Sequence, residues 1–186
     1  ISTVFAECHS MYRQDGPETE RPLGETEFVT GCAAMAASGS FGPTRACAAM
    51  FGGVDMTLGA AARPILEQHL ERSGGRFKGV RYSTGWDASD RIPNVVAAEH
   101  ALTAPAALAA AGVLDEMGLT LDVWLYHPQL ADVATLAAAM PGLTIVLNHV
   151  GSPILGGPYR DRKDEVFADW RQLIGDVAWH ANVYCK

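Results

Sequence analysis

Two histidines each follow an apolar run that has the character of a buried β-strand. In "LDVWLYHPQL" the run stops at His127, and in "TIVLNHVGSP" it stops at His149. Runs of this length and β-branched content are typical of strands in parallel sheets, which are buried on both faces. Neutral imidazoles at adjacent strand ends could converge on one zinc-like metal ion or on one substrate carbonyl. A single histidine after a strand is more often a hydrogen-bonded structural residue, so it is the pairing that favours chemistry.

Polar side chains end several other predicted strands as well. In a (β/α)8 barrel they are expected there, because the active site is built at the carboxyl ends of the strands. A doubly wound nucleotide-binding fold would instead show a glycine-rich turn after its first strand, and here that position reads "AECHSMYRQDGPETE". The polar strand endings are Glu7-Cys8-His9, Asp55, Arg81-Tyr82-Ser83, Tyr126-His127 and Asn148-His149.

Strand-like and helix-like segments alternate along the whole chain, which predicts βα units around a parallel sheet in one domain, residues 1–186. The helical segments carry apolar residues at helical spacing, and those at 59–73 and 129–140 are followed by Gly74-Gly75 and Pro141-Gly142. The predicted strands are 3–7, 46–54, 77–83, 119–126, 144–149 and 182–185, and the predicted helices are 25–37, 59–73, 101–117, 129–140 and 162–179.

Composition narrows the class of partner. The 186 residues are 48% hydrophobic and 19% charged, and no apolar run approaches the roughly 20 residues of a membrane span. A formal charge of −7 without a Lys/Arg cluster argues against nucleic acid as a partner. The four cysteines lack CxxC spacing, which indicates reduced thiols. We therefore expect a cytoplasmic protein with a small-molecule substrate and no membrane partner, and a homo-oligomer is compatible with the sequence.

Several motifs together resemble the amidohydrolase-2 family, the TIM-barrel metal-dependent hydrolases that include sugar-lactone and pyrone-dicarboxylate lactonases. The motifs that carry the resemblance are "ECHSMYR", "GETEFVTG", "DMTLGAAARPILE", "GGRFKGVRYST", "DVWLYHPQL", "IVLNHVGSP" and "GPYRDRKDEVFADWR". The resemblance covers essentially the whole chain. It implies a (β/α)8 barrel and hydrolysis of a lactone or a related ring.

The family pattern also includes a His-x-His on the first strand and an Asp on the eighth, and neither occurs in this sequence. By this resemblance the six predicted strands are strands two to seven of an incomplete barrel. We therefore expect a piece of a longer protein that is inactive alone. If the chain were complete, a non-catalytic binding domain would be the better hypothesis.

The resemblance implies roles for particular residues. His127 matches the histidine that ends strand five, and His149 the one that ends strand six. Arg81 ends strand four, where binuclear amidohydrolases carry a carboxylated lysine or a glutamate that bridges two metals. A guanidinium cannot bridge metals, so we expect at most one divalent, zinc-like metal at His127 and His149, with metal-independent catalysis as the alternative.

The mechanism that the resemblance implies is attack of water on a lactone carbonyl. His127 and His149 would polarise that carbonyl, and Arg81 would hold the oxyanion or an anionic part of the substrate. His9, Tyr126 and Lys186 are further candidate substrate contacts. A decarboxylase of the same superfamily is the alternative function.

Overall fold

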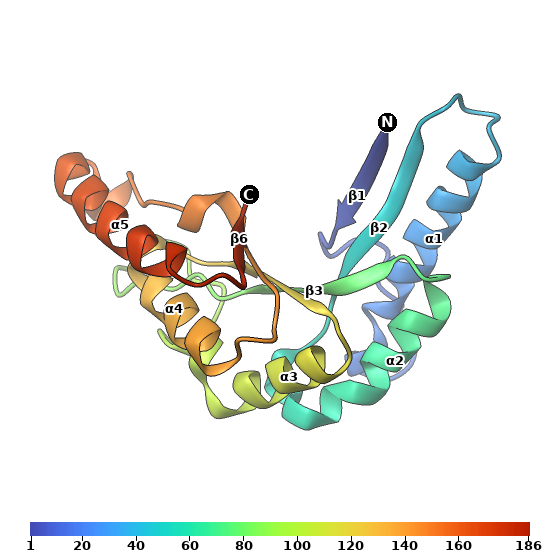
Figure 1. Cartoon of the computed structure of the whole chain (residues 1–186), viewed down its shortest axis with the longest axis horizontal. Coiled ribbons are helices and arrows are strands. Elements are labelled where there is room, and N and C mark those ends of the chain that lie inside the picture. The colour runs from blue at the N-terminus through green and yellow to red at the C-terminus, as the bar shows by residue number, and fades with distance from the viewer.

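The computed structural model describes residues 1–186 and contains one parallel sheet. Its six strands follow chain order, β1-β2-β3-β4-β5-β6, and every neighbouring pair is parallel. The sheet curves into a half-barrel that is open between β1 and β6 (Figure 1). The predicted incomplete (β/α)8 fold with six strands is thus confirmed. The strands are β1 Ser2–Ala6, β2 Arg45–Gly53, β3 Phe77–Ser83, β4 Thr120–Trp124, β5 Ile145–Leu147 and β6 Val183–Cys185.

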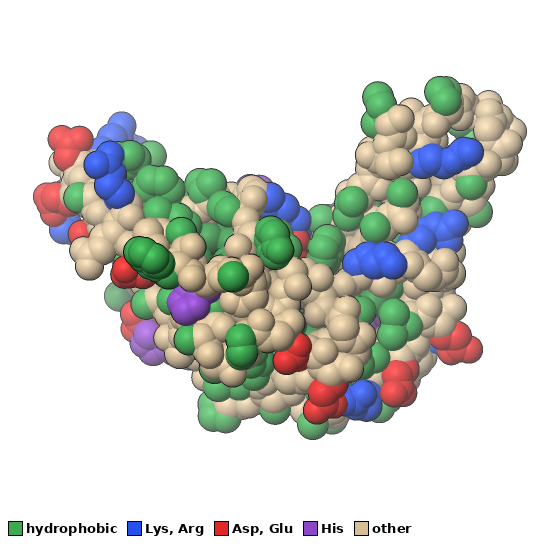
Figure 2. All heavy atoms as spheres, viewed as in Figure 1, with side chains coloured by type: hydrophobic (Ala, Val, Ile, Leu, Met, Phe, Trp, Pro, Cys, Tyr) green, Lys and Arg blue, Asp and Glu red, His purple; other side chains and the backbone are tan.

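One α-helix lies between each pair of successive strands, and the helices cover the outer, convex face of the sheet (Figure 1). The concave side carries none, and Figure 2 shows the molecule hollowed between the arm with β1 and β2 and the arm with α5. None of the helices has the length and apolar character needed to cross a membrane. The helices are α1 Leu23–Ala37, α2 Arg63–Arg72, α3 Pro105–Glu116, α4 Leu130–Ala139 and α5 Lys163–Ala178.

Most element boundaries lie within two residues of the sequence-based expectation, and the larger differences have local causes. The helix predicted over 59–73 begins only at Arg63, because Gly59 has a φ of 58° inside the preceding 3-10 segment. The helix predicted over 101–117 is interrupted at Ala104, which is extended because the residue before a proline disfavours the α conformation. The strand predicted over 144–149 ends at Leu147.

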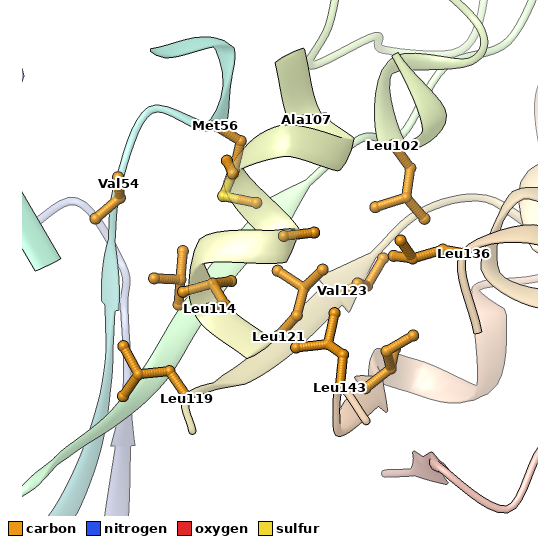
Figure 3. Packing of buried hydrophobic residues seen from close by; sticks show 14 of the residues in the cluster. Val54, Met56, Leu102, Ala107, Leu114, Leu119, Leu121, Val123, Leu136 and Leu143 are labelled. Atoms are coloured by element: carbon orange, nitrogen blue, oxygen red, sulfur yellow. The ribbon is translucent and has the colours of Figure 1, made fainter. Parts of the chain in front are cut away.

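The hydrophobic core lies between the convex face of the sheet and the helices. Leu121 and Val123 of β4 point into it beside Leu114 of α3 (Figure 3). Because successive side chains of a strand face opposite sides, the residue between them, Asp122, faces the concave side. The alternation of β4 therefore places a buried carboxylate in the interior of the half-barrel.

A second buried polar group, His69, ties α2 to the sheet. Its Nδ1 lies 2.8 Å from the Thr26 hydroxyl, its Nε2 lies 3.2 Å from the Gly53 carbonyl oxygen, and its ring stacks on Phe77 at 4.7 Å. The neutral imidazole satisfies both contacts by donating from Nε2 and accepting at Nδ1. Burial lowers the pKa of His69 to about 4.

We expect the free energy of unfolding to fall by up to about 3 kcal/mol as the pH drops from about 6.5 to about 4. In that window the unfolded chain binds a proton at His69 that the folded chain rejects, so protonation favours unfolding. Urea denaturation at a series of pH values, in wild type and in His69→Gln, measures this contribution. His180→Gln, which changes a partly exposed histidine, is the control. A pH dependence that is unchanged in His69→Gln would contradict the expectation.

Candidate active site

Asp122 is the centre of a buried polar network at the carboxyl ends of four neighbouring strands. Its carboxylate is fully buried and accepts hydrogen bonds from Arg81 Nε at 3.2 Å and from Lys186 Nζ at 2.5 Å. Asn148 Nδ2 is the third donor. The register between β3 and β4 places Arg81 directly beside Asp122. Two cations and one amide thus satisfy a carboxylate that would otherwise be costly to bury.

Arg81 presents the free edge of its guanidinium to the concave side. Besides the bond from Nε, its Nη1 donates to the Glu7 carbonyl oxygen at 3.2 Å. Nη2 makes no hydrogen bond within the chain, and the side chain is 21% exposed. Because Asp122 and Glu7 hold two of its nitrogens, the guanidinium is fixed in orientation while one nitrogen remains free for a ligand.

Two hollows, of about 380 Å³ and 320 Å³, lie beside Arg81. The first also reaches Asp55 and Val95, and the second reaches Asn148 and His149. We call these the first and the second hollow. Both are lined by Glu7, His9, Arg81, Ser83 and Trp124.

Glu7 organises the β1 side of the hollows. Its buried Oε1 accepts hydrogen bonds from the His9 backbone N at 3.2 Å and from the Tyr12 hydroxyl at 3.3 Å, and it lies 3.0 Å from His9 Nδ1. Burial and the nearby Glu7 charge raise the pKa of Tyr12 well above its usual value, so its hydroxyl remains a donor. The predicted substrate contact His9 therefore does line the hollows, with an exposed ring paired to a buried carboxylate.

His149 reaches the second hollow through an unusual turn. Strand alternation alone would send it to the side opposite Asn148, but His149, Val150 and Ser152 have φ angles of 50°, 50° and 40°. This conformation costs on the order of 1–3 kcal/mol for a β-branched residue such as Val150. The Trp170 indole donates to the Val150 carbonyl oxygen at 2.7 Å and helps to hold the turn. The turn redirects the exposed His149 toward the concave side.

His127 lies elsewhere. It begins the 3-10 segment that follows β4, and it lines a separate hollow of about 460 Å³ beside α5. Its Nδ1 accepts from the Ile154 backbone N at 3.3 Å, and its ring meets the Tyr159 ring edge to face at 6.2 Å. Burial lowers the pKa of His127, which favours the neutral ring. The structure does not bring the predicted pair His127 and His149 into one hollow.

The two remaining predicted contacts differ in their placement. Lys186 lies in the polar network, with Nζ bound to Asp122 and 5.2 Å from the centre of the Phe51 ring. Tyr126 donates its hydroxyl to the Pro93 carbonyl oxygen at 2.7 Å, and its ring packs edge to face on Trp124 at 5.1 Å. Tyr126 therefore packs against Trp124, which lines both hollows, and lines neither hollow itself.

The model of the amidohydrolase family matches residues 5–186 of the chain. The chain belongs to the amidohydrolase family. This membership confirms the resemblance that the sequence motifs carry.

Solved structures agree with the fold of this amidohydrolase. An amidohydrolase from Burkholderia multivorans with bound zinc is 23% identical, with a TM-score of 0.62 over 87% of this chain and 48% of that chain. The same protein with bound HEPES gives 24% identity and a TM-score of 0.58 over 82% of this chain and 48% of that chain. The uncharacterized protein y4mH of Sinorhizobium fredii is 26% identical over 122 residues, which are 66% of this chain and 38% of that protein. The chain thus spans about half the length of the solved amidohydrolases and less of y4mH.

The residues of this chain do not fit a metal site by themselves. Zinc in enzymes is held by at least three side chains, drawn from His, Cys, Asp and Glu. The chain has no group of three such side chains in an arrangement that could hold a metal ion. The predicted ligands His127 and His149 line different hollows. We therefore assign no catalytic step to a metal.

Sequence reasoning does not select Asp122 as a site residue and gives Glu7 only as one of the polar strand endings, although a signal for Asp122 is present. Asp122 is the one charged residue in the otherwise apolar strand "LTLDVWLY", and it shares a face with Trp124 two positions later. A charge inside a strand that is buried on both faces requires partners. That requirement, combined with the alternation of strand faces, is enough to suggest Arg81 on the preceding strand as the partner of Asp122.

A long loop after β3, residues 84–100, forms part of the wall of the first hollow through Val95. The buried Gln129 amide binds both ends of this loop. Its Oε1 accepts from Trp86 N at 2.9 Å, and its Nε2 donates to the carbonyl oxygens of Thr84 and Glu99, both at 2.7 Å. Both N–H groups of Nε2 are used by the loop, so Gln129 ties its two ends together, while the Val95 backbone N donates to the Gly85 carbonyl oxygen at 2.9 Å.

We expect Gln129→Leu to lower the free energy of unfolding by about 2 kcal/mol and to loosen the loop. Leucine has a similar volume, but it leaves buried backbone groups of the loop without partners. Trypsin cleavage after Arg91, an exposed residue of the loop, should become about tenfold faster. Gln68→Leu, on the outer helix α2, is the matched control. Cleavage after Arg91 at the wild-type rate would show that Gln129 does not hold the loop.

Proposed function

We propose that the natural protein that carries this chain is a hydrolase that opens a carboxylated lactone or a related cyclic ester by addition of water. Membership of the amidohydrolase family supports the reaction class. The observation that carries the substrate class is Arg81, whose guanidinium is anchored by the buried Asp122 and keeps Nη2 free at the mouth of the half-barrel.

Arg81 suits the anionic part of such a substrate. A guanidinium presents paired N–H donors in a plane, and this geometry matches a carboxylate or a developing oxyanion. Its anchor at Asp122 means that little reorganisation is needed when the ligand arrives. Lys186 adds a second positive charge beside the same carboxylate.

His149 is placed to activate the water. It is exposed and lines the second hollow together with Asn148, whose Nδ2 donates to Asp122. In the proposed reaction His149 takes a proton from the water. The water oxygen bonds to the ring carbonyl carbon, the ring C–O bond breaks, and the leaving oxygen receives the proton from His149. Asp122 and Glu7 hold Arg81 and take no proton.

A panel of lactones tests this proposal with the natural protein. Carboxylated lactones should release one acid equivalent per turnover, measured at constant pH, with no carbon dioxide. Uncharged lactones of the same ring size should be turned over about a hundredfold more slowly, because they lack the group that Arg81 binds. Carbon dioxide release would identify a decarboxylase instead, and equal turnover of charged and uncharged rings would contradict the role of Arg81.

A further inference from the structure

A buried glutamate outside the two hollows is hydrogen-bonded to the segment that forms part of their wall. Glu25, in the first turn of α1, is 1% exposed and lines neither hollow. A charged side chain in such a position needs several partners to remain buried. Glu25 must therefore be held by a neighbouring part of the chain.

All the partners of Glu25 come from the segment that carries the β1 side of the site. Its Oε1 accepts from the backbone N of Cys8 at 3.1 Å, from the backbone N of Ser10 at 2.8 Å and from the Ser10 hydroxyl at 3.0 Å. The Cys8 thiol is a fourth, weaker donor at 3.5 Å. One carboxylate oxygen thus binds the residue before His9 and the residue after it.

Two residues of the segment have a strained backbone conformation. His9 and Met11 have φ angles of 60° and 53°, in the left-handed region that non-glycine residues rarely adopt. The left-handed His9 turns the N–H groups on either side toward the same point, which creates an anion-binding concavity of backbone donors. Glu25 supplies the anion for it, and it does so from the helix N-terminus, where a negative charge is favourable.

The start of α1 is also fitted closely to this segment. A Cβ atom on Gly24 would lie 2.4 Å from the Met11 carbonyl oxygen and 2.8 Å from the Arg13 backbone N. The helix and the segment are therefore in direct backbone contact at the residue next to Glu25. A side chain at position 24 would therefore displace the segment.

We infer that Glu25 is a positioning residue of the active site, which acts by holding residues 8–10 so that the His9 ring and the Glu7 carboxylate meet at the mouth of the half-barrel. Its effect on catalysis rests on the proposed function, whereas its effect on the segment does not. Glu7 Oε1 contacts both the backbone N of His9 and its Nδ1, so a shift of the segment moves both groups of the pair.

Amide hydrogen exchange in the natural protein tests the structural part. In Glu25→Ala the amides of Cys8 and Ser10 lose their acceptor, and we expect them to exchange about tenfold faster. The Glu7 amide, which donates to the Phe51 carbonyl oxygen at 2.9 Å, should keep its rate and serves as the control within the same molecule. Glu25→Gln retains an acceptor oxygen and should restore most of the protection. Glu67→Ala, an exposed glutamate on α2, controls for the loss of a negative charge.

Turnover tests the catalytic part. We expect Glu25→Ala to lower kcat by about tenfold to a hundredfold, because a shift of Glu7 also displaces Arg81, whose Nη1 donates to the Glu7 carbonyl oxygen. Glu25→Gln should recover most of kcat. A uniform rise of exchange across the sheet would indicate general destabilisation and would overturn the inference.

The two parts can fail separately. If no lactone is turned over by wild type, the proposed function fails, and the exchange of Cys8 and Ser10 still decides whether Glu25 holds the segment. If wild type is active and Glu25→Ala keeps both the wild-type exchange and the wild-type kcat, the inference about Glu25 is wrong while the proposed function stands.

Discussion

Asp122→Ala is expected to lower the free energy of unfolding by about 3 kcal/mol. The substitution removes the fully buried acceptor shared by Arg81, Lys186 and Asn148, so two cations and one amide lose their partner together. The Lys186 side chain is 44% exposed, so its ammonium group can be hydrated once Asp122 is removed. The loss of unfolding free energy is therefore at the low end of the range for breaking a buried ion pair. Urea denaturation of the natural protein measures the change.

Asp122→Asn is the matched variant, because it keeps the shape and one acceptor oxygen and removes only the charge. We expect it to lose about half as much stability, with part of the network still formed. Asp115→Ala, on the outer helix α3, controls for removal of an aspartate. A loss of less than about 1 kcal/mol in Asp122→Ala would show that the network around Asp122 contributes little to folding.

Arg81→Met is expected to lower kcat/KM by a factor of about 100 to 1000, which is the usual effect of removing one preorganised donor to a developing or bound negative charge. Methionine preserves most of the volume of the side chain and none of its donors. Steady-state kinetics with a carboxylated lactone that wild type turns over measure the effect.

Arg81→Lys separates charge from geometry. Lysine keeps a positive charge but cannot bind Asp122, the Glu7 carbonyl oxygen and a ligand in one plane, so we expect it to recover only a small part of the activity. Arg160→Met, which removes an exposed arginine before α5, should behave as wild type. Wild-type kcat/KM in Arg81→Met would remove Arg81 from the site.

The sequence predicts the architecture well because the signals for it are local and repeated. Each of the six predicted strands is present, and each of the five predicted helices is present with small shifts of its ends. The shifts occur where one residue overrides the hydrophobic pattern, as Gly59 and the Ala104-Pro105 pair do.

The site is predicted less completely because it depends on which face each side chain takes. The prediction treats His127 and His149 as equivalent ends of successive strands. His127 lies beyond the end of β4, in a 3-10 segment that faces the hollow beside α5, while a left-handed turn at His149 and Val150 brings His149 to the concave side. No sequence pattern signals a left-handed valine, since glycine is the usual residue there. Arg81, His9 and Lys186, by contrast, lie on the concave side. Each of them follows or ends a strand, which is where a site is expected in this fold.

In the proposed reaction Arg81, held by Asp122, binds the anionic group of the substrate. The sharpest test compares kcat/KM for a carboxylated lactone and for its methyl ester, in wild type and in Arg81→Met. We predict that wild type prefers the carboxylate over the ester about a hundredfold and that Arg81→Met loses this preference. Esterification of the substrate and substitution of Arg81 would remove the same interaction. An equal preference for the carboxylate in wild type and in Arg81→Met would show that Arg81 does not bind this group.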